Sequence, residues 1–213
     1  RAAQSPSPTR YQNRPGRGYD QKLPDPGQDG DHPWEEWADS AQAPDGSLKS
    51  GWLLETAPMA ARVPKEHSET AWLTTRGIEF MEAQDGDKPW LCHLSYIKPH
   101  WPYLAPAPYN DMYSAADLPL VNRRDGEHDH PLMRTWTQSR ICQSFSREHV
   151  RDTVGPVYMG LIKELDDQMG RLFDYLETSG RMEDTMIVFC SDHGDNMGDH
   201  WMGEKDLFYD CSA

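Results

Sequence analysis

The sequence predicts an α/β fold, in which a mixed, mostly parallel sheet is flanked by helices. Three observations support it. Apolar residues with helical spacing extend over about 157–179 and end before Gly180, a hydrophobic run follows at 185–190, and a polar loop comes directly after this run. Helix, short loop, buried strand and polar loop form the repeating unit of an α/β protein, in which ligands bind at the carboxyl ends of the strands.

The composition excludes two classes of partner. The 213 residues include 21 Lys and Arg against 35 Asp and Glu, which gives a net charge of −14. Nucleic acid is excluded because its phosphates are bound by clustered Lys and Arg. A membrane span is excluded because the longest apolar run has about five residues, whereas a span needs roughly 20. A small anionic ligand stays possible where a cation neutralises its site.

The ends and the cysteines suggest the context of the chain. It begins at Arg1 without an initiator Met or a signal peptide, and it stops at Ala213 soon after its polar loop, so we expect a fragment that is incomplete at both ends. The four cysteines are widely spaced and form no C-x-x-C pair, which favours a reducing compartment and a cytoplasmic location.

Two regions follow from the residue pattern. Residues 1–66 are rich in Pro, Gly, Asp and Ser and have no sustained apolar period. Because Trp34, Trp37 and Trp52 are too many large aromatics for a disordered linker, we expect an irregular excursion that packs on the core. Residues 67–213 are expected to form part of the α/β domain, incomplete at both ends.

The elements of the second region can be taken in order. Ser68 is expected to cap a helix that ends near residue 84, and residues 90–96 read as a buried strand. Residues 98–108 contain four prolines and are expected to form an ordered, extended loop, whereas 122–130 read as a charged, solvated loop. The helix at about 157–179 and the buried strand at 185–190 complete the series.

The polar loop carries the candidate chemistry. Asp192 and His193 follow the predicted strand directly, and a carboxylate oxygen with an imidazole nitrogen suits Mn²⁺, Zn²⁺ or Ca²⁺. Gly194 and Gly198 permit tight turns over such an ion. Lys205 offers a compact positive charge to an anionic substrate. The alternative is an acidic, glycine-containing surface loop without a ligand.

These residues also resemble a known family. Ser191-Asp192-His193-Gly194-Asp195, Gly198-Asp199-His200 and Gly203-Glu204-Lys205 resemble the metal and substrate motif of the sulfatase branch of the alkaline phosphatase superfamily. Within this branch the chain is most similar to phosphonate monoester hydrolases, which also act as phosphodiesterases. The stretches that carry this similarity, besides the Asp-His…Lys segment, are Arg62-Val63-Pro64-Lys65-Glu66, Pro99-His100-Trp101-Pro102 and His130-Pro131-Leu132-Met133.

The resemblance implies roles for five residues. Asp192 and His193 match two ligands of one divalent metal ion, either Mn²⁺, Ca²⁺ or Zn²⁺. His100 matches a histidine that assists the leaving group or holds a substrate oxygen, although its ring could also be a structural part of its Pro-rich loop. Lys205 matches a lysine that contacts the transferring group, and Tyr19 matches a tyrosine that lines the substrate site.

Part of the family's active site is missing from the sequence. The family's nucleophile is a cysteine in a Cys-x-Pro-x-Arg setting, matured to formylglycine, and an N-terminal aspartate adds a metal ligand; neither is present. Cys142 lacks the proline, and Cys211 comes after the metal motif. His200 is expected either to support the metal ligands or to be structural, and His128 and His130 are expected to be solvated. The chain alone is therefore expected to lack hydrolase activity.

Three functions stay open at this point. The first is a metal-dependent hydrolase of phosphonate monoesters and phosphodiesters, present here as a fragment that lacks the nucleophile. The second is a sulfatase, in which many members carry Asn at the position of His193. The third is a non-catalytic homologue that binds a metal or a partner. For the enzymes we expect a small anionic ester as substrate and a full-length protein that forms a homo-oligomer.

Overall fold

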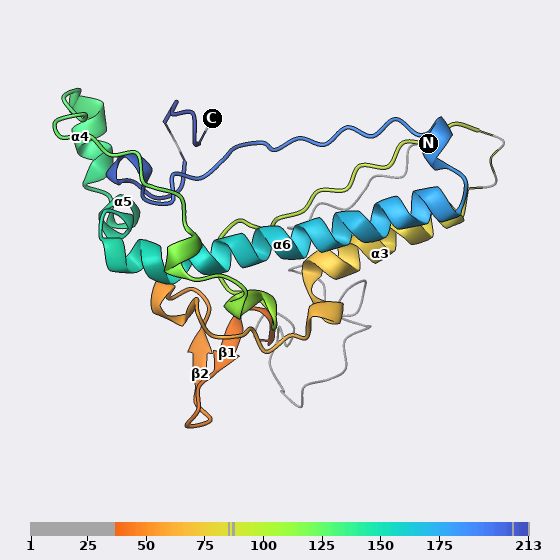
Figure 1. The fold of residues 1–213 in the computed structure, drawn as a ribbon, viewed down its shortest axis with the longest axis horizontal. Helices are drawn as coiled ribbons and strands as arrows, with labels where there is room; N and C mark the ends of the chain where they lie inside the picture. Colours follow the sequence, from red (N-terminus) through yellow and green to blue (C-terminus); the bar gives the residue numbers. More distant parts are fainter. Residues whose placement is uncertain (1–36, 85, 87, 206, 213) are drawn as a thin grey trace.

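The computed structural model describes residues 37–84, 86, 88–205 and 207–212, and these residues are mostly helical (Figure 1). The α-helices are α3 (Glu69–Glu82), α4 (Pro131–Thr137), α5 (Arg140–Phe145) and α6 (Glu148–Thr178). The strands are β1 (Ser40–Gln42) and β2 (Leu48–Ser50). Single 3₁₀ turns are η2 (Leu54–Thr56), η3 (Lys65–His67), η4 (Tyr109–Asp111), η5 (Ala115–Asp117), η6 (Met182–Asp184) and η7 (Asp199–Trp201). No helix in this described part is long and apolar enough to cross a membrane.

The long helix α6 is the axis of the molecule, and the sequence predicts its end better than its start. Gly180 has a φ of +70°, and the N–H groups of Gly180 and Arg181 donate to the carbonyls of Glu177 and Leu176, so the last turn is closed as expected. The helix begins at Glu148 and continues through Pro156, whereas the prediction placed its start near 157. A proline is most often found in the first turn, but here the buried residues around it hold the earlier turns in place.

Helix α3 is confirmed by its cap and lies beside α6. The Ser68 hydroxyl accepts a hydrogen bond from the Ala71 N–H at 3.2 Å, as predicted for the N-cap. The two helices are joined by Arg171, whose guanidinium donates to the Thr75 hydroxyl at 3.2 Å and to the Ala71 carbonyl at 3.5 Å.

The predicted buried strands at 90–96 and 185–190 are corrected by the structure. Both segments are extended and follow the length of α6, but neither pairs with another strand (Figure 1). The described residues form one sheet, the antiparallel pair β1–β2, so the expected mostly parallel sheet is not seen in them. A strand needs a neighbour for its N–H and C=O groups, and these segments have none here.

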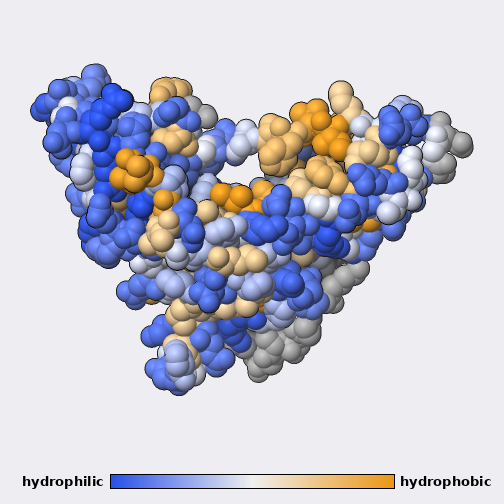
Figure 2. Space-filling model, in the orientation of Figure 1, coloured by the Kyte–Doolittle hydropathy of each residue, from blue (hydrophilic) through white to orange (hydrophobic). Residues whose placement is uncertain are grey.

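The segment at 185–190 is largely exposed, whereas the segment at 90–96 is exposed only at alternate residues. Met186 and Phe189 are 87% and 72% exposed and Leu91 is 89% exposed, while Trp90, Cys92, Leu94 and Tyr96 are half-buried. Figure 2 shows hydrophobic side chains on the side of the molecule where these segments run over α6. Cys190, expected in a buried strand, is exposed as well. The apolar pattern correctly marks an extended segment, but this chain does not bury it.

The Pro-rich loop at 98–108 is ordered and buried, as predicted. Tyr103, Leu104 and Ala105 are 2%, 3% and 0% exposed. Tyr103 and Ala105 belong to a core cluster under α6, and Leu104 belongs to a second cluster with residues from the 37–63 region. The loop therefore connects both clusters and is held rigidly below the polar loop that follows residue 190.

Candidate active site

The polar loop is closed on itself by the side chain of Asp195. One carboxylate oxygen accepts from the N–H groups of Met197 and Glu204, at 2.9 and 3.1 Å, and the other accepts from the Tyr103 hydroxyl at 2.8 Å. The Asn196 N–H donates to the Glu204 carbonyl at 2.8 Å. These bonds bring the end of the loop back to its beginning and anchor it to the buried Pro-rich loop.

This closure brings His100 and Lys205 into contact. Lys205 Nζ lies 2.8 Å from His100 Nε2, and His100 Nδ1 lies 2.9 Å from the Trp101 carbonyl oxygen. Because a lysine ammonium and a carbonyl have fixed donor and acceptor roles, the His100 ring is neutral, accepts at Nε2 and donates at Nδ1. The structure thus brings together two of the residues to which the sequence assigned chemistry.

His193 lies beside this pair and has the geometry of a metal ligand. Its ring centre is 5.9 Å from that of His100. Its Nδ1 lies 2.7 Å from the Gly194 carbonyl oxygen, so Nδ1 carries the proton and Nε2 keeps its lone pair. Asp192 Oδ2 lies 3.7 Å from this Nε2. A nitrogen lone pair and a carboxylate oxygen are ligand types that a divalent cation accepts, so the chemistry of this pair suits the predicted metal ion, although the Asp192 side chain is 88% exposed.

Tyr19, the remaining predicted site residue, falls outside the described residues. The four others converge from two segments, the Pro-rich loop and the polar loop. The placement agrees with a shared site, while the chemical role of each side chain stays a prediction.

Lys98 is a site-supporting residue to which the sequence assigned no role. Its Nζ donates to the Pro102 carbonyl at 2.6 Å and to the His100 carbonyl at 3.4 Å, which fixes the turn that presents the His100 ring. Burial lowers the pKa of Lys98, and the charges of Asp39, Glu69 and Glu164 oppose that shift. No local pattern distinguishes such a lysine, because its anchoring partners are backbone carbonyls of its own loop.

Tyr103 is a second supporting residue to which the sequence gave no role. Burial raises the pKa of its hydroxyl well above the usual range, and the charge of Asp195 raises it further. Burial, together with Asp195, also raises the pKa of Tyr158 to about 12. The neutral Tyr103 hydroxyl therefore serves as a permanent donor to Asp195. Its position in the Pro-rich loop hinted at order but not at this partner.

His128 differs from the prediction of a solvated residue. It is half-buried, and its Nε2 donates to the His200 carbonyl at 2.7 Å. His130 is exposed, as expected, and its ring nitrogen accepts from the Leu132 N–H to cap α4. The charged loop between 122 and 130 is tied to the polar loop at further points, since Arg123 Nε donates to the Gly198 carbonyl at 2.7 Å and the His200 N–H donates to the Asn122 carbonyl at 2.8 Å.

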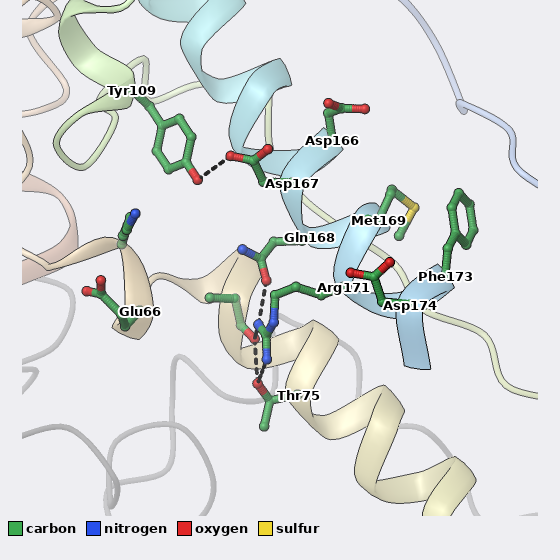
Figure 3. Close-up of a pocket in the computed structure, with 13 residues that line it drawn as sticks. Glu66, Thr75, Tyr109, Asp166, Asp167, Gln168, Met169, Arg171, Phe173 and Asp174 are labelled. Carbon is green, nitrogen blue, oxygen red and sulfur yellow. Dashed lines mark hydrogen bonds between the residues drawn. The ribbon is translucent and has the colours of Figure 1, made fainter. Parts of the chain in front are cut away.

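A large cavity lies away from this site. It has a volume of about 720 Å³ and is lined by η3, α3 and the middle of α6 (Figure 3). Tyr109 donates to Asp167 at 2.8 Å, and Arg171 donates to Gln168 at 2.6 Å, so four of its polar side chains are paired with one another. His100, Asp192, His193 and Lys205, the predicted site residues that the structure describes, do not line this cavity. The chemistry therefore favours the smaller convergence of His100, His193 and Lys205.

Comparisons with known proteins place the chain among the sulfatases. The sulfatase family model matches residues 10–208. The multifunctional alkaline phosphatase superfamily protein PehA of Trinickia caryophylli is 37% identical over 155 residues, which cover 66% of this chain and 30% of PehA. An arylsulfatase of Clostridium perfringens is 30% identical over 154 residues, which cover 68% of this chain and 30% of the arylsulfatase.

Two solved structures resemble the fold. Phosphonate monoester hydrolase SpPMH from Silicibacter pomeroyi has a TM-score of 0.70 and 33% identity, with 84% of this chain and 36% of that chain covered. Phosphonate monoester hydrolase of Agrobacterium radiobacter has a TM-score of 0.65 and 31% identity, with 73% and 33% covered. The chain thus spans about a third of the length of the relatives that it matches. With the family model matching almost its whole length, the chain belongs to the sulfatase family.

Proposed function

We propose that this chain forms part of a metal-dependent hydrolase of phosphonate monoesters and phosphodiesters and lacks the nucleophile of that enzyme. The observation that carries the proposal is the contact of Lys205 Nζ with His100 Nε2 at 2.8 Å, beside the ring of His193. The names of PehA and of the two phosphonate monoester hydrolases support the substrate class.

The charges of the site suit an anionic ester. Hydrolysis of such an ester develops negative charge on the non-bridging and leaving oxygens, so fixed positive charge near them stabilises the transition state. Lys205 supplies such a charge, and its contact with His100 places both groups at one edge of the substrate. His100 Nε2, which now contacts Lys205, can serve as an acid only when it carries a proton and the leaving oxygen takes the place of Lys205 there; transfer of that proton then neutralises the departing oxygen. With a net charge of −14 for the chain, this cationic group of residues is a local exception on an acidic molecule.

Asp192 and His193 are the residues of this chain that would hold the metal ion. The relatives belong to a metal-dependent family, and the protonated Nδ1 of His193 leaves its Nε2 free as a ligand. When bound, a divalent ion polarises the ester and favours an ionised nucleophile. Mn²⁺, Ca²⁺ and Zn²⁺ all accept this pair of ligand types.

A sulfatase is the second candidate. The arylsulfatase of Clostridium perfringens favours it, since that enzyme is 30% identical to this chain. Sulfate monoesters and phosphodiesters both present a singly charged group, so the same lysine and histidine suit either one. The two candidate enzymes would therefore differ in their relative rates on sulfate monoesters and on phosphodiesters.

The test compares two polypeptides on two substrates. The full-length protein that contains this chain is expected to hydrolyse bis-p-nitrophenyl phosphate with a higher kcat/KM than p-nitrophenyl sulfate, and the 213-residue chain alone is expected to turn over neither. The reverse substrate order would establish the sulfatase. Turnover by the chain alone would refute the missing nucleophile. The cytoplasmic location, the homo-oligomer and the lack of nucleic-acid binding stay predictions.

A further inference from the structure

His200 is a buried histidine with one unused ring nitrogen. The residue is 7% exposed, and its Nε2 atom is buried and has no hydrogen-bond partner among the described residues. Its Nδ1 lies 2.7 Å from Glu127 Oε2, and both side chains are about nine-tenths buried, with exposures of 9% and 11%. A buried polar nitrogen without a partner destabilises a protein unless a ligand occupies it. The position therefore points to a ligand.

Two further metal-binding side chains face this histidine. A ring nitrogen of His200, a carboxylate oxygen of Asp210 and the Sγ atom of Cys211 all lie within 4.8 Å of one another. Nitrogen, oxygen and sulfur ligands together suit Zn²⁺ or Co²⁺ better than Ca²⁺ or Mg²⁺, because a thiolate is a soft ligand. Three protein ligands and one water complete a tetrahedral shell.

Glu127 gives His200 the protonation state that a metal ligand needs. A carboxylate accepts the Nδ1 proton, which leaves the Nε2 lone pair free. The ring is also fixed by Tyr209, which stacks on it with a centroid distance of 3.8 Å and an interplanar angle of 12°. The nitrogen is therefore oriented before any ion binds.

The three ligands join two parts of the molecule. His200 belongs to the polar loop that carries Asp192 and His193, whereas Asp210 and Cys211 follow that loop. The Gly194 N–H donates to the Ser212 carbonyl at 3.4 Å, and a Cβ atom on Gly194 would lie 2.1 Å from the Cys211 carbonyl oxygen. The segment around Cys211 thus packs directly on the residue after His193, and an ion at His200 would fix it there.

We propose that His200, Asp210 and Cys211 bind a divalent ion of the zinc type, separate from the ion assigned to Asp192 and His193, and that this ion holds the polar loop closed. Binding releases the Cys211 thiol proton to solvent. It also moves Sγ from its contact with Asn196 Oδ1, now 3.0 Å, to the metal. The inference does not depend on the substrate class proposed above.

The test adds Co²⁺ as the probe to the whole 213-residue chain, which is first prepared free of metal. The background carries Asp192→Asn and His193→Ala, so the other candidate site does not contribute. We expect one equivalent of Co²⁺ to bind with the near-ultraviolet absorption of a cobalt–thiolate bond, and Zn²⁺ to displace it. Cys211→Ser is expected to abolish this band, and Cys190→Ser, a change of an exposed thiol, to retain it.

Glu127→Gln tests the orientation of the ring. It is expected to weaken Co²⁺ binding about 10- to 100-fold, the usual effect of losing the partner of a metal-bound histidine. Far-ultraviolet circular dichroism of each variant establishes that the helices are folded. A folded chain that shows no thiolate band, or a band that persists in Cys211→Ser, overturns the proposal. Failure of the substrate assay leaves these outcomes unchanged, so the two proposals fail separately.

Discussion

Lys205 Nζ donates to His100 Nε2 at 2.8 Å, although 105 positions separate the two residues in the chain. The bond leaves the imidazole neutral and directs its remaining proton to the Trp101 carbonyl. It also holds the half-buried Lys205 against His100, whose ring centre lies 5.9 Å from that of His193. The pair therefore joins a positive charge to an imidazole nitrogen, His100 Nε2, at one edge of the site.

Removing the charge of Lys205 is expected to impair turnover strongly. In the full-length protein, Lys205→Ala should lower kcat/KM for a phosphodiester about 100- to 1,000-fold, the range found when one stabilising donor of a transition state is deleted. Steady-state kinetics measures it. Lys88→Ala, which removes an exposed lysine, should leave kcat/KM unchanged. Equal kcat/KM values for the two variants would show that Lys205 is not part of the active site.

Substitution of His100 separates a role in proton transfer from a structural role. His100→Ala is expected to reduce kcat about 100-fold or more for an ester with an alkoxide leaving group, and much less for a p-nitrophenolate, which leaves without a proton. The measurement is kcat over a series of leaving groups. His93→Ala, at an exposed position, serves as the control. An equal loss across the series would show that the ring only supports its loop.

The packing of η4 on α6 predicts opposite effects of alanine at two glycines of the same helix. A Cβ atom on Gly160 would lie 2.0 Å from the Tyr109 carbonyl oxygen, whereas a Cβ on Gly170 would meet nothing within 4 Å. Gly160→Ala should therefore lower the free energy of unfolding by roughly 1–3 kcal/mol through overpacking. Gly170→Ala should raise it by roughly 0.5–1 kcal/mol through helix propensity.

Denaturant unfolding of the two glycine variants provides the measurement. Both substitutions add one methyl group to α6 and raise its intrinsic helix propensity equally, so the difference between them reports the contact with Tyr109 alone. Similar free energies of unfolding for Gly160→Ala and Gly170→Ala would show that η4 can move away from α6 without a loss of stability.

The sequence predicts those parts of the fold that depend on local interactions. The Ser68 cap and the Gly180 terminus each involve residues within a few positions of one another, and both are found as expected. The start of α6 was missed because buried packing keeps Pro156 inside the helix. The residues at 185–190 were misjudged for the opposite reason, since a strand requires a partner that the hydrophobic pattern cannot supply.

The candidate site follows the same division. Asp192 and His193 are adjacent in sequence, and their residue types alone suggested a metal. The resemblance assigned Lys205 and His100 to one site but did not predict their contact, because no local rule joins positions so far apart. The roles of Tyr103 and Lys98 were not predictable, since each acts through a loop whose path is set by the buried core.

The hydrogen bond from Tyr103 to Asp195 predicts a loss of stability in alkali. Tyrosine in an unfolded chain has a pKa of about 10, whereas burial raises the pKa of Tyr103 in the folded chain. The folded state therefore favours the protonated hydroxyl. Its contribution to stability is complete below pH 10 and is lost as the unfolded chain ionises above it, by up to about 1.4 kcal/mol per pH unit.

Tyr103→Phe should lower the free energy of unfolding by roughly 1–3 kcal/mol at pH 7, because Asp195 loses a donor. The same substitution should also make the free energy of unfolding fall less steeply between about pH 10 and pH 12. Urea unfolding at several pH values measures both effects, and an unchanged alkaline slope in Tyr103→Phe would contradict the raised pKa.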